Sequence, residues 1–207
     1  MCLYNRNFAI VINSLVINME KFESDIINSI NVLQQGGTIL YPTDTIWGIG
    51  CDATDEEAVE RIFVVKERPS NKSLIILVAE ERDVLRYVAN PDLRVFDYLQ
   101  QITKPTTVIY DQAVGLASNL VNEDGSIGIR IVQDEFCRHL IKRFKKPIVS
   151  TSANLSGQPS PTNFSDIDEK IKSRVDYVVQ YRQEEKAKSV SSSVIKWQNG
   201  KVIVIRE

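Results

Sequence analysis

The sequence predicts a single mixed α/β domain (an α+β fold), with helices flanking a twisted sheet of parallel and antiparallel strands. Three observations predict this fold. The 207 residues are enough for one full-sized core and leave little room for two. Apolar residues make up 43% of the chain and charged residues 25%, as in ordinary globular proteins. Segments with helical periodicity alternate along the chain with short apolar runs typical of strands.

The predicted helices have apolar residues three or four positions apart. Gly36-Gly37 ends the first helix, and Thr54 followed by Glu57 forms a capping box that opens the second. The third and fourth are short, and the fifth is clearly amphipathic. In chain order, the predicted helices cover residues 22–33, 54–66, 81–88, 92–101, 134–144 and 165–173.

The predicted strands are short apolar runs bounded by turn residues. LIILVA, residues 74–79, is apolar throughout, as expected for a strand that is buried on both faces. SVIKW and KVIVIR flank Asn199-Gly200, which predicts a β-hairpin with a type I′ turn. In chain order, the predicted strands cover residues 38–41, 74–79, 106–110, 127–132, 147–150, 176–181, 193–197 and 201–206.

Residues 1–18 differ from the rest of the chain. Their apolar run from Phe8 to Ile17 is too short to cross a bilayer, and no signal-peptide cleavage site follows it. We expect an N-terminal extension or an extra edge strand over 1–18, and one domain over 19–207. The rest of the sequence also predicts no membrane segment. Three cysteines, odd in number and far apart, indicate a reduced, cytoplasmic protein in which Cys51 and Cys137 are buried.

Charge and rare residues exclude several functions. The net charge of −2 argues against a dedicated nucleic-acid-binding domain, which usually has a basic excess. His139 is the single histidine of the sequence, so a histidine-rich metal site cannot form. A Ser-His-Asp triad could use only His139, which lies in a predicted amphipathic helix and is better explained as a surface or partly packed residue. The Walker motif GxxxxGK[ST] is also missing from the sequence.

Two polar clusters lie in the first half of the chain. YPTDTIWGIG, residues 41–50, places hydroxyls in a turn directly after a strand, where they either shape the turn or hold a small polar ligand. KERPSNK, residues 66–72, carries Lys66, Arg68 and Lys72 at the end of a predicted helix. These cations either complement the helix dipole or converge on a polyphosphate.

Further polar residues follow strands in the second half. STSANLSGQPSPT, residues 150–162, begins at a strand end, where α/β proteins often bind ligands, although a plain surface loop would also explain it. Arg130 alternates with isoleucines in the strand-like segment IGIRI. A guanidinium inside such a strand needs a partner, which is either an internal acid or a bound anion.

In this order, YPTDTIWGIG, KERP and SANLSGQPSPT resemble the signature of the YrdC/Sua5 family, from roughly residue 20 to residue 206. The resemblance implies a YrdC/RibB-like fold of the short form. It also implies L-threonylcarbamoyladenylate synthase activity. Such a nucleotidyltransferase condenses L-threonine, bicarbonate or CO₂, and ATP, and releases pyrophosphate. Mg²⁺ would accompany ATP. A downstream threonylcarbamoyl transferase would use the product to form N6-threonylcarbamoyladenosine (t6A) in tRNA.

The resemblance also implies roles for individual residues. Lys66 and Arg68 are the implied catalytic pair, while metal ligands stay unassigned. Implied ATP contacts are Lys66, Arg68, Lys72, Ser126, Ser152, Asn154, Ser160 and Arg206. Implied threonine contacts are Thr45, Arg130, Ser150 and Ser192. The chain departs from the family pattern at Ser73 and Val132, where proline is usual, at Ser191, where an acid is frequent, and in the segment 102–110.

Two other interpretations compete with the enzyme. The same cations could contact the phosphates of double-stranded RNA or tRNA in an RNA-binding module without turnover, although the net charge of −2 weighs against it. Alternatively, the chain could be an interaction protein that kept the fold and lost the activity. Pyrophosphate release that requires both threonine and bicarbonate separates the three interpretations.

Overall fold

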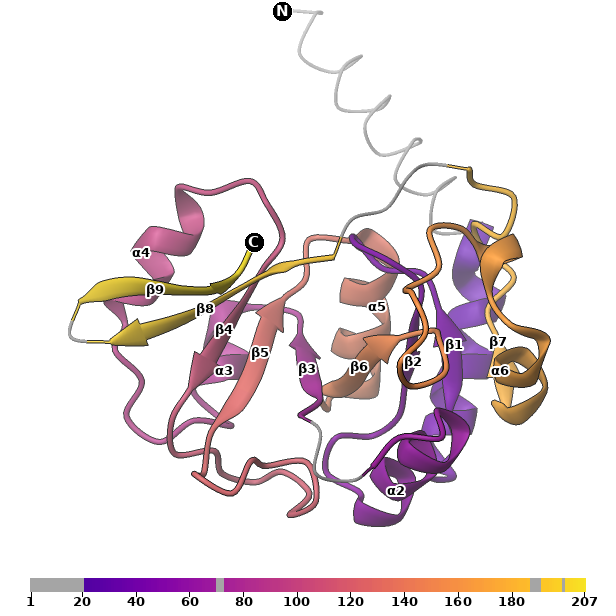
Figure 1. Cartoon of the computed structure of the whole chain (residues 1–207), viewed down its shortest axis with the longest axis horizontal. Coiled ribbons are helices and arrows are strands. Elements are labelled where there is room, and N and C mark those ends of the chain that lie inside the picture. The colour runs from indigo at the N-terminus through magenta and orange to yellow at the C-terminus, as the bar shows by residue number, and fades with distance from the viewer. Residues whose placement is uncertain (1–20, 70–72, 187–190, 199) are drawn as a thin grey trace, which may run out of the picture.

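The computed structural model describes residues 21–69, 73–186, 191–198 and 200–207. Within them, a mixed sheet of 9 strands runs in the order β7-β1-β2-β6-β3-β5-β4-β8-β9 (Figure 1). The predicted extension over 1–18 lies outside the described residues. The strands are β1 (Ile39–Tyr41), β2 (Gly48–Gly50), β3 (Ile75–Val78), β4 (Thr106–Tyr110), β5 (Ile127–Ile131), β6 (Ile148–Ser152), β7 (Tyr177–Val178), β8 (Ser193–Gln198) and β9 (Lys201–Arg206).

Parallel and antiparallel pairs alternate irregularly across the sheet, which confirms the predicted mixed α/β fold. The pairs β1–β7, β3–β5 and β4–β8 are parallel, and the other neighbouring pairs are antiparallel. Strand β6 connects the two halves of the sheet, because Ser150 pairs with Ile75 of β3 and Ser152 pairs with Gly48 of β2. The C-terminal end of β6 therefore lies at the centre of the sheet.

The helices pack against this sheet through apolar faces, and Figure 1 shows α3 and α5 behind the strands. Helix α5 buries Phe136, Leu140 and Phe144, and the ring of Phe136 meets Phe22 of the helical segment 21–34 edge-on at 5.8 Å. The helices after that segment are α2 (Glu56–Val65), α3 (Glu81–Val84), α4 (Arg94–Gln100), α5 (Glu135–Phe144) and α6 (Glu169–Arg174), and a 3₁₀ turn covers Phe164–Asp166.

The predicted capping box at Thr54 and Glu57 is wrong. The cap of α2 is Asp55, whose side chain accepts from the backbone N–H groups of Glu57 at 3.0 Å and Ala58 at 3.1 Å. Thr54 instead donates its hydroxyl to the Asp52 carboxylate at 2.7 Å. A carboxylate one position further on therefore caps the helix, because a neighbouring acid already engages the threonine.

Other boundaries also differ from the prediction. Helix α6 starts at Glu169, where Asp168 caps it, and not at residue 165. Strand β7 has only two residues, Tyr177–Val178, of the predicted 176–181. Strand β6 runs on to Ser152, two residues past the predicted end at residue 150. The predicted hairpin is confirmed as β8 and β9, although Asn199 of its turn lies outside the described residues.

The remaining expectations concern single residues and membranes. Cys51 and Cys137 are both fully buried and free, as predicted. His139 is half-buried on α5, with its ring 5.9 Å from that of Phe22. None of the helices in the described part of the chain has the length and apolar character that a membrane span requires.

Strand β2 was not predicted, and its glycines allow the close approach of β1 and β6. A Cβ on Gly50 would lie 2.5 Å from the Val149 carbonyl oxygen and 2.8 Å from Tyr41 Cε1. We expect Gly50→Ala to lower the free energy of unfolding by about 1–3 kcal/mol through overpacking, as measured by urea denaturation.

Gly48→Ala is the matched control, since its Cβ would meet the movable Ser150 hydroxyl first, at 3.1 Å. Equal losses of stability in the two variants would contradict the close approach at Gly50.

Candidate active site

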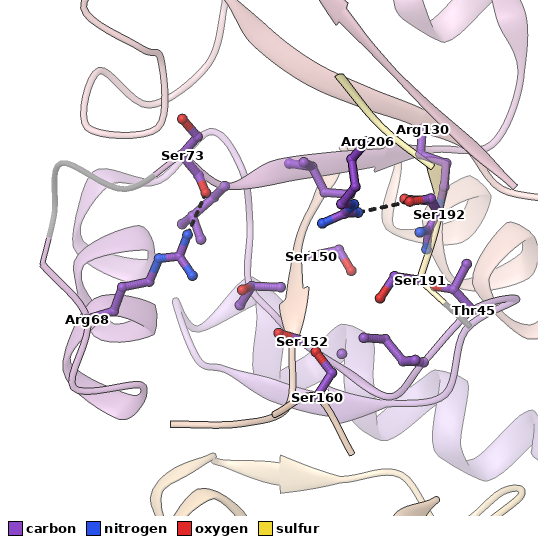
Figure 2. Close-up of a pocket in the computed structure, with 15 residues that line it drawn as sticks. Thr45, Arg68, Ser73, Arg130, Ser150, Ser152, Ser160, Ser191, Ser192 and Arg206 are labelled. Atoms are coloured by element: carbon purple, nitrogen blue, oxygen red, sulfur yellow. Dashed lines mark hydrogen bonds between the residues drawn. The ribbon is translucent and has the colours of Figure 1, made fainter. Parts of the chain in front are cut away.

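A cavity of about 190 Å³ lies where β2, β3, β5 and β6 meet the β8–β9 hairpin (Figure 2). Side chains and backbone from segments far apart in the sequence line it. The sequence-predicted residues among them are Thr45, Arg68, Arg130, Ser150, Ser152, Ser160, Ser192 and Arg206. The structure therefore brings most of the predicted site together in one place.

The Thr43–Ile46 turn forms one wall of the cavity. Thr43 donates its hydroxyl to the Ile46 carbonyl at 2.8 Å and accepts from the Thr45 backbone N–H at 3.0 Å. Threonine hydroxyls often close such turns locally. The Thr43 and Thr45 hydroxyls are 3.0 Å apart, so this turn places Thr45 at the cavity.

Arg130 is buried in β5, with only 4% of its side chain exposed. Its Nη2 lies 3.1 Å from Asp44 Oδ1, and the Asp44 side chain is 11% exposed. Of the two partners that the sequence left open, the structure supplies an internal acid. Arg130 also lines the cavity, and its buried Nε has no hydrogen-bond partner in the described part of the chain. The guanidinium can therefore face an anion while Asp44 holds its other side.

The Lys66 side chain is more deeply buried than its place at a helix end suggested. Lys66 caps the end of helix α2, where the sequence predicted a helix end, but only 1% of the residue is exposed. Its Nζ donates to the Ser152 carbonyl and, at 2.7 Å, to the Asn154 carbonyl. Its own carbonyl accepts from the Ser156 N–H at 2.9 Å. Burial, with a smaller effect of the nearby Arg68 charge, lowers the pKa of Lys66 to about 7. Lys66 thus holds the 152–156 loop from beneath.

The β8–β9 hairpin closes the opposite side of the cavity. The Ser192 hydroxyl lies 3.0 Å from the Thr107 hydroxyl of β4. Arg206, on β9, donates through Nη2 to the Ser192 carbonyl at 2.9 Å, as Figure 2 shows. Strand β4 therefore fixes Ser192, and Ser192 in turn orients Arg206.

Arg68 reaches the cavity from the segment after α2. Its Nη2 donates to the Ser73 carbonyl at 2.9 Å (Figure 2). Its Nε is buried and has no hydrogen-bond partner among the residues described. Partial burial lowers the pKa of Arg68, but the group stays a cation at physiological pH. Arg68 can therefore bind an anion without losing the bond that orients it.

Some predicted residues lie elsewhere. Asn154 lines a neighbouring cavity of about 350 Å³, which shares Ser160 with the first. Ser126 is buried away from the cavity lining, and Lys72 lies outside the described residues. Ser73 and Ser191 line the cavity, although the sequence gave them no role beyond their departure from the family pattern. In the sequence, only their positions next to predicted contacts, Lys72 and Ser192, could have indicated that these two serines line the cavity.

The lining of the main cavity is positive and rich in hydroxyls. Arg68, Arg130 and Arg206 face it together with several serines, and none of the described residues that line it is acidic. Nor do the described residues contain a group of three or more His, Cys, Asp or Glu side chains that could hold a metal ion. The chain is thus a single-domain α/β protein whose positively charged, hydroxyl-lined cavity has the chemistry that suits an anionic ligand.

Comparisons with known proteins identify the family. The family model for Sua5, YciO and YrdC proteins, described as "Telomere recombination", matches residues 31–207. The chain belongs to this family. A curated relative, "Threonylcarbamoyl-AMP synthase" of Pseudoalteromonas translucida, is 32% identical over 160 residues, which are 76% of this chain and 86% of the relative.

Solved structures share the fold. E. coli YciO superimposes with a TM-score of 0.74 at 22% identity, covering 88% of each chain, as expected for the short form. P. abyssi Sua5, solved in complex with L-threonine, gives a TM-score of 0.78 at 24% identity. That match covers 89% of this chain and 54% of the longer Sua5 chain, so this protein spans about half of that relative.

Proposed function

We propose that this protein is a threonylcarbamoyl-AMP synthase that forms threonylcarbamoyl-AMP and pyrophosphate from L-threonine, bicarbonate or CO₂, and ATP. The observation that carries the proposal is the convergence of Arg68, Arg130 and Arg206 on one hydroxyl-lined cavity. Relatives that bear this enzyme name at about 30% identity support it.

The proposed reaction needs positioning and charge neutralisation more than proton transfer. The threonine amine adds to CO₂ to give a carbamate, whose oxygen attacks the α-phosphorus of ATP, and pyrophosphate leaves. In this proposal, Arg68 and Arg206 contact the phosphates, and Mg²⁺ enters with ATP as part of the substrate. Lys66 contributes through the 152–156 loop that it holds. Ser152 contacts ATP from the main cavity, and Asn154 does so from the neighbouring cavity that shares Ser160 with it.

Threonine is placed on the other side of the cavity. Arg130 pairs with its carboxylate, and Thr45, Ser150 and Ser192 contact its remaining polar groups. This assignment is consistent with P. abyssi Sua5, a relative in fold that has been solved with L-threonine. The product would then pass to a threonylcarbamoyl transferase for t6A formation in tRNA.

Purified protein given ATP, Mg²⁺, L-threonine and bicarbonate is expected to release pyrophosphate only when all are present. Arg68→Ala should reduce that rate by about ten- to hundredfold, because it removes a charge-assisted contact to phosphate. Pyrophosphate is measured by a coupled assay, and threonylcarbamoyl-AMP by mass spectrometry.

Arg82→Ala is the matched control, because 78% of that side chain is exposed and it lies on α3, outside the cavity. No pyrophosphate from the wild-type protein would refute the proposed reaction. A wild-type rate in Arg68→Ala would remove Arg68 from the phosphate site. Salt-sensitive RNA binding without turnover would instead favour the RNA-binding module.

A further inference from the structure

The Asn122 side chain links Ser73 to Ser126. In the described part of the chain, no other side-chain hydrogen bond joins these two segments. The Asn122 Oδ1 accepts from the Ser73 hydroxyl at 2.6 Å, and its Nδ2 donates to the Ser126 hydroxyl at 3.0 Å. Ser73 follows the segment that carries Arg68, and Ser126 directly precedes β5. One amide thus adds a side-chain link between Ser73, just before β3, and the turn that precedes β5.

The turn around Asn122 is firmly built. The Asn122 N–H donates to the Ser126 carbonyl at 2.9 Å, and its carbonyl accepts from the Gly125 N–H at 2.8 Å. Gly125 has a φ of +78°, which favours glycine, and Asp124 accepts from the Ser126 N–H at 3.0 Å. Ser126 itself is 3% exposed. Asn122 therefore acts from a fixed support, whereas Ser73 is exposed.

The connection continues from Ser73 to the cavity. The Ser73 carbonyl accepts from Arg68 Nη2 at 2.9 Å, and both residues line the cavity. The direction of the Arg68 guanidinium therefore depends on where Ser73 is held. The Asn122 amide offers an acceptor to Ser73 and a donor to Ser126 at the same time, which alanine cannot do.

We propose that Asn122 is a positioning residue that holds Ser73 and, through it, aims Arg68 at the phosphates of ATP. This inference rests on the proposed function, since it takes ATP as the ligand of Arg68. It also gives Ser126 a role as the buried anchor of Asn122, without a contact of its own to the ligand. Threonine is assigned to other residues, so its binding should not depend on Asn122.

The test is a double-mutant cycle with Asn122→Ala, Ser73→Ala and the double variant. Each single variant should raise the KM and the Kd for ATP by about three- to tenfold, the equivalent of one net hydrogen bond. The double variant should be no worse than the weaker-binding single variant, because both changes break the same connection. The KM for threonine should stay at its wild-type value.

Asn119→Ala is the matched control, because that amide lies in the same segment but donates to the Glu56 carbonyl at 3.0 Å. Equilibrium ATP binding is measured without threonine, so it reports on Asn122 even if turnover is absent. Unchanged ATP affinity in the single variants, multiplied effects in the double variant, or an equal rise in threonine KM would each overturn the proposal.

Two further outcomes separate this inference from the proposed function. If the wild-type protein binds ATP but releases no pyrophosphate, the proposed reaction is refuted. The ATP affinity of the variants then still tests the role of Asn122. A wild-type protein that binds no ATP overturns both. If Asn122→Ala does not fold, the Ser73→Ala variant tests the role of Asn122 by itself. Ser73 is exposed, so we expect that variant to fold. Unaltered ATP affinity in it would exclude the connection through Asn122.

Discussion

Replacing Lys66 with methionine is expected to lower the free energy of unfolding by about 2–4 kcal/mol. Methionine fills the space of the lysine stem but leaves the Ser152 and Asn154 carbonyls without their donor. Turnover should fall as well, because the loop that carries these groups loses its support. Urea denaturation and pyrophosphate release measure the two effects, with the exposed Lys170→Met as control.

The pH dependence of stability gives an independent check on Lys66. Its pKa is about 7 in the folded protein against 10.5 as the ordinary value, so between these pH values the unfolded chain binds a proton that the native protein lacks. Native stability therefore rises with pH in this window, by up to about 1.4 kcal/mol per pH unit, and the gain is lost again as the pH falls from 10.5 to 7. The Lys66→Met variant should lack this rise. Parallel pH profiles of the two proteins would contradict the buried lysine.

Arg130→Met is expected to lower the free energy of unfolding by about 3–5 kcal/mol, because it leaves the Asp44 carboxylate without its cation in a largely buried place. The double variant Arg130→Met/Asp44→Asn should recover most of that loss. Asparagine keeps an acceptor for the Gln133 N–H, which Asp44 Oδ2 now accepts at 3.2 Å. Thermal and urea unfolding of both variants measure the difference. If Arg130→Met alone is as stable as the wild-type protein, Asp44 is not its energetic partner.

The double variant also isolates the role of Arg130 in binding. Its stability is restored, but it still lacks a cation for the threonine carboxylate. We expect its KM for threonine to rise about ten- to hundredfold, while its KM for ATP changes little. An unchanged threonine KM in the restored protein would remove Arg130 from the threonine site.

The parts of the fold that were predictable have strong local signals. The β8–β9 hairpin follows from Asn199-Gly200 between two apolar runs, and α5 from its amphipathic pattern. Strand β2 was missed because it has only three residues, and the two glycines on either side of Ile49 have low strand propensity. Its strand conformation comes from pairing with β1 and β6, which are contacts that a local pattern cannot show.

The candidate site also has parts that the sequence predicts and parts that only tertiary packing determines. Arg68 and the serines of β6 and of the loop after it were found because their order resembles a family signature. The depth of a charged side chain is set by tertiary packing, so the sequence could not show that Lys66 is buried or that Asp44 faces Arg130. Asn122 belongs to no motif, and only the arrangement of two distant segments reveals its contacts.

The order of the strands also determines when, during folding, the chain becomes able to bind a ligand. The cavity depends on contacts between distant segments, such as Gly48 with Ser152, Leu77 with Arg130, and Thr107 with Ser192. Bringing such segments together costs chain entropy before the contacts stabilise the fold, so topologies of this kind fold slowly. Ligand binding should therefore return late in refolding, after most helical signal has recovered. A nascent chain that still lacks its final hairpin would already hold most of the sheet, yet without Ser192 and Arg206 it could not close the cavity.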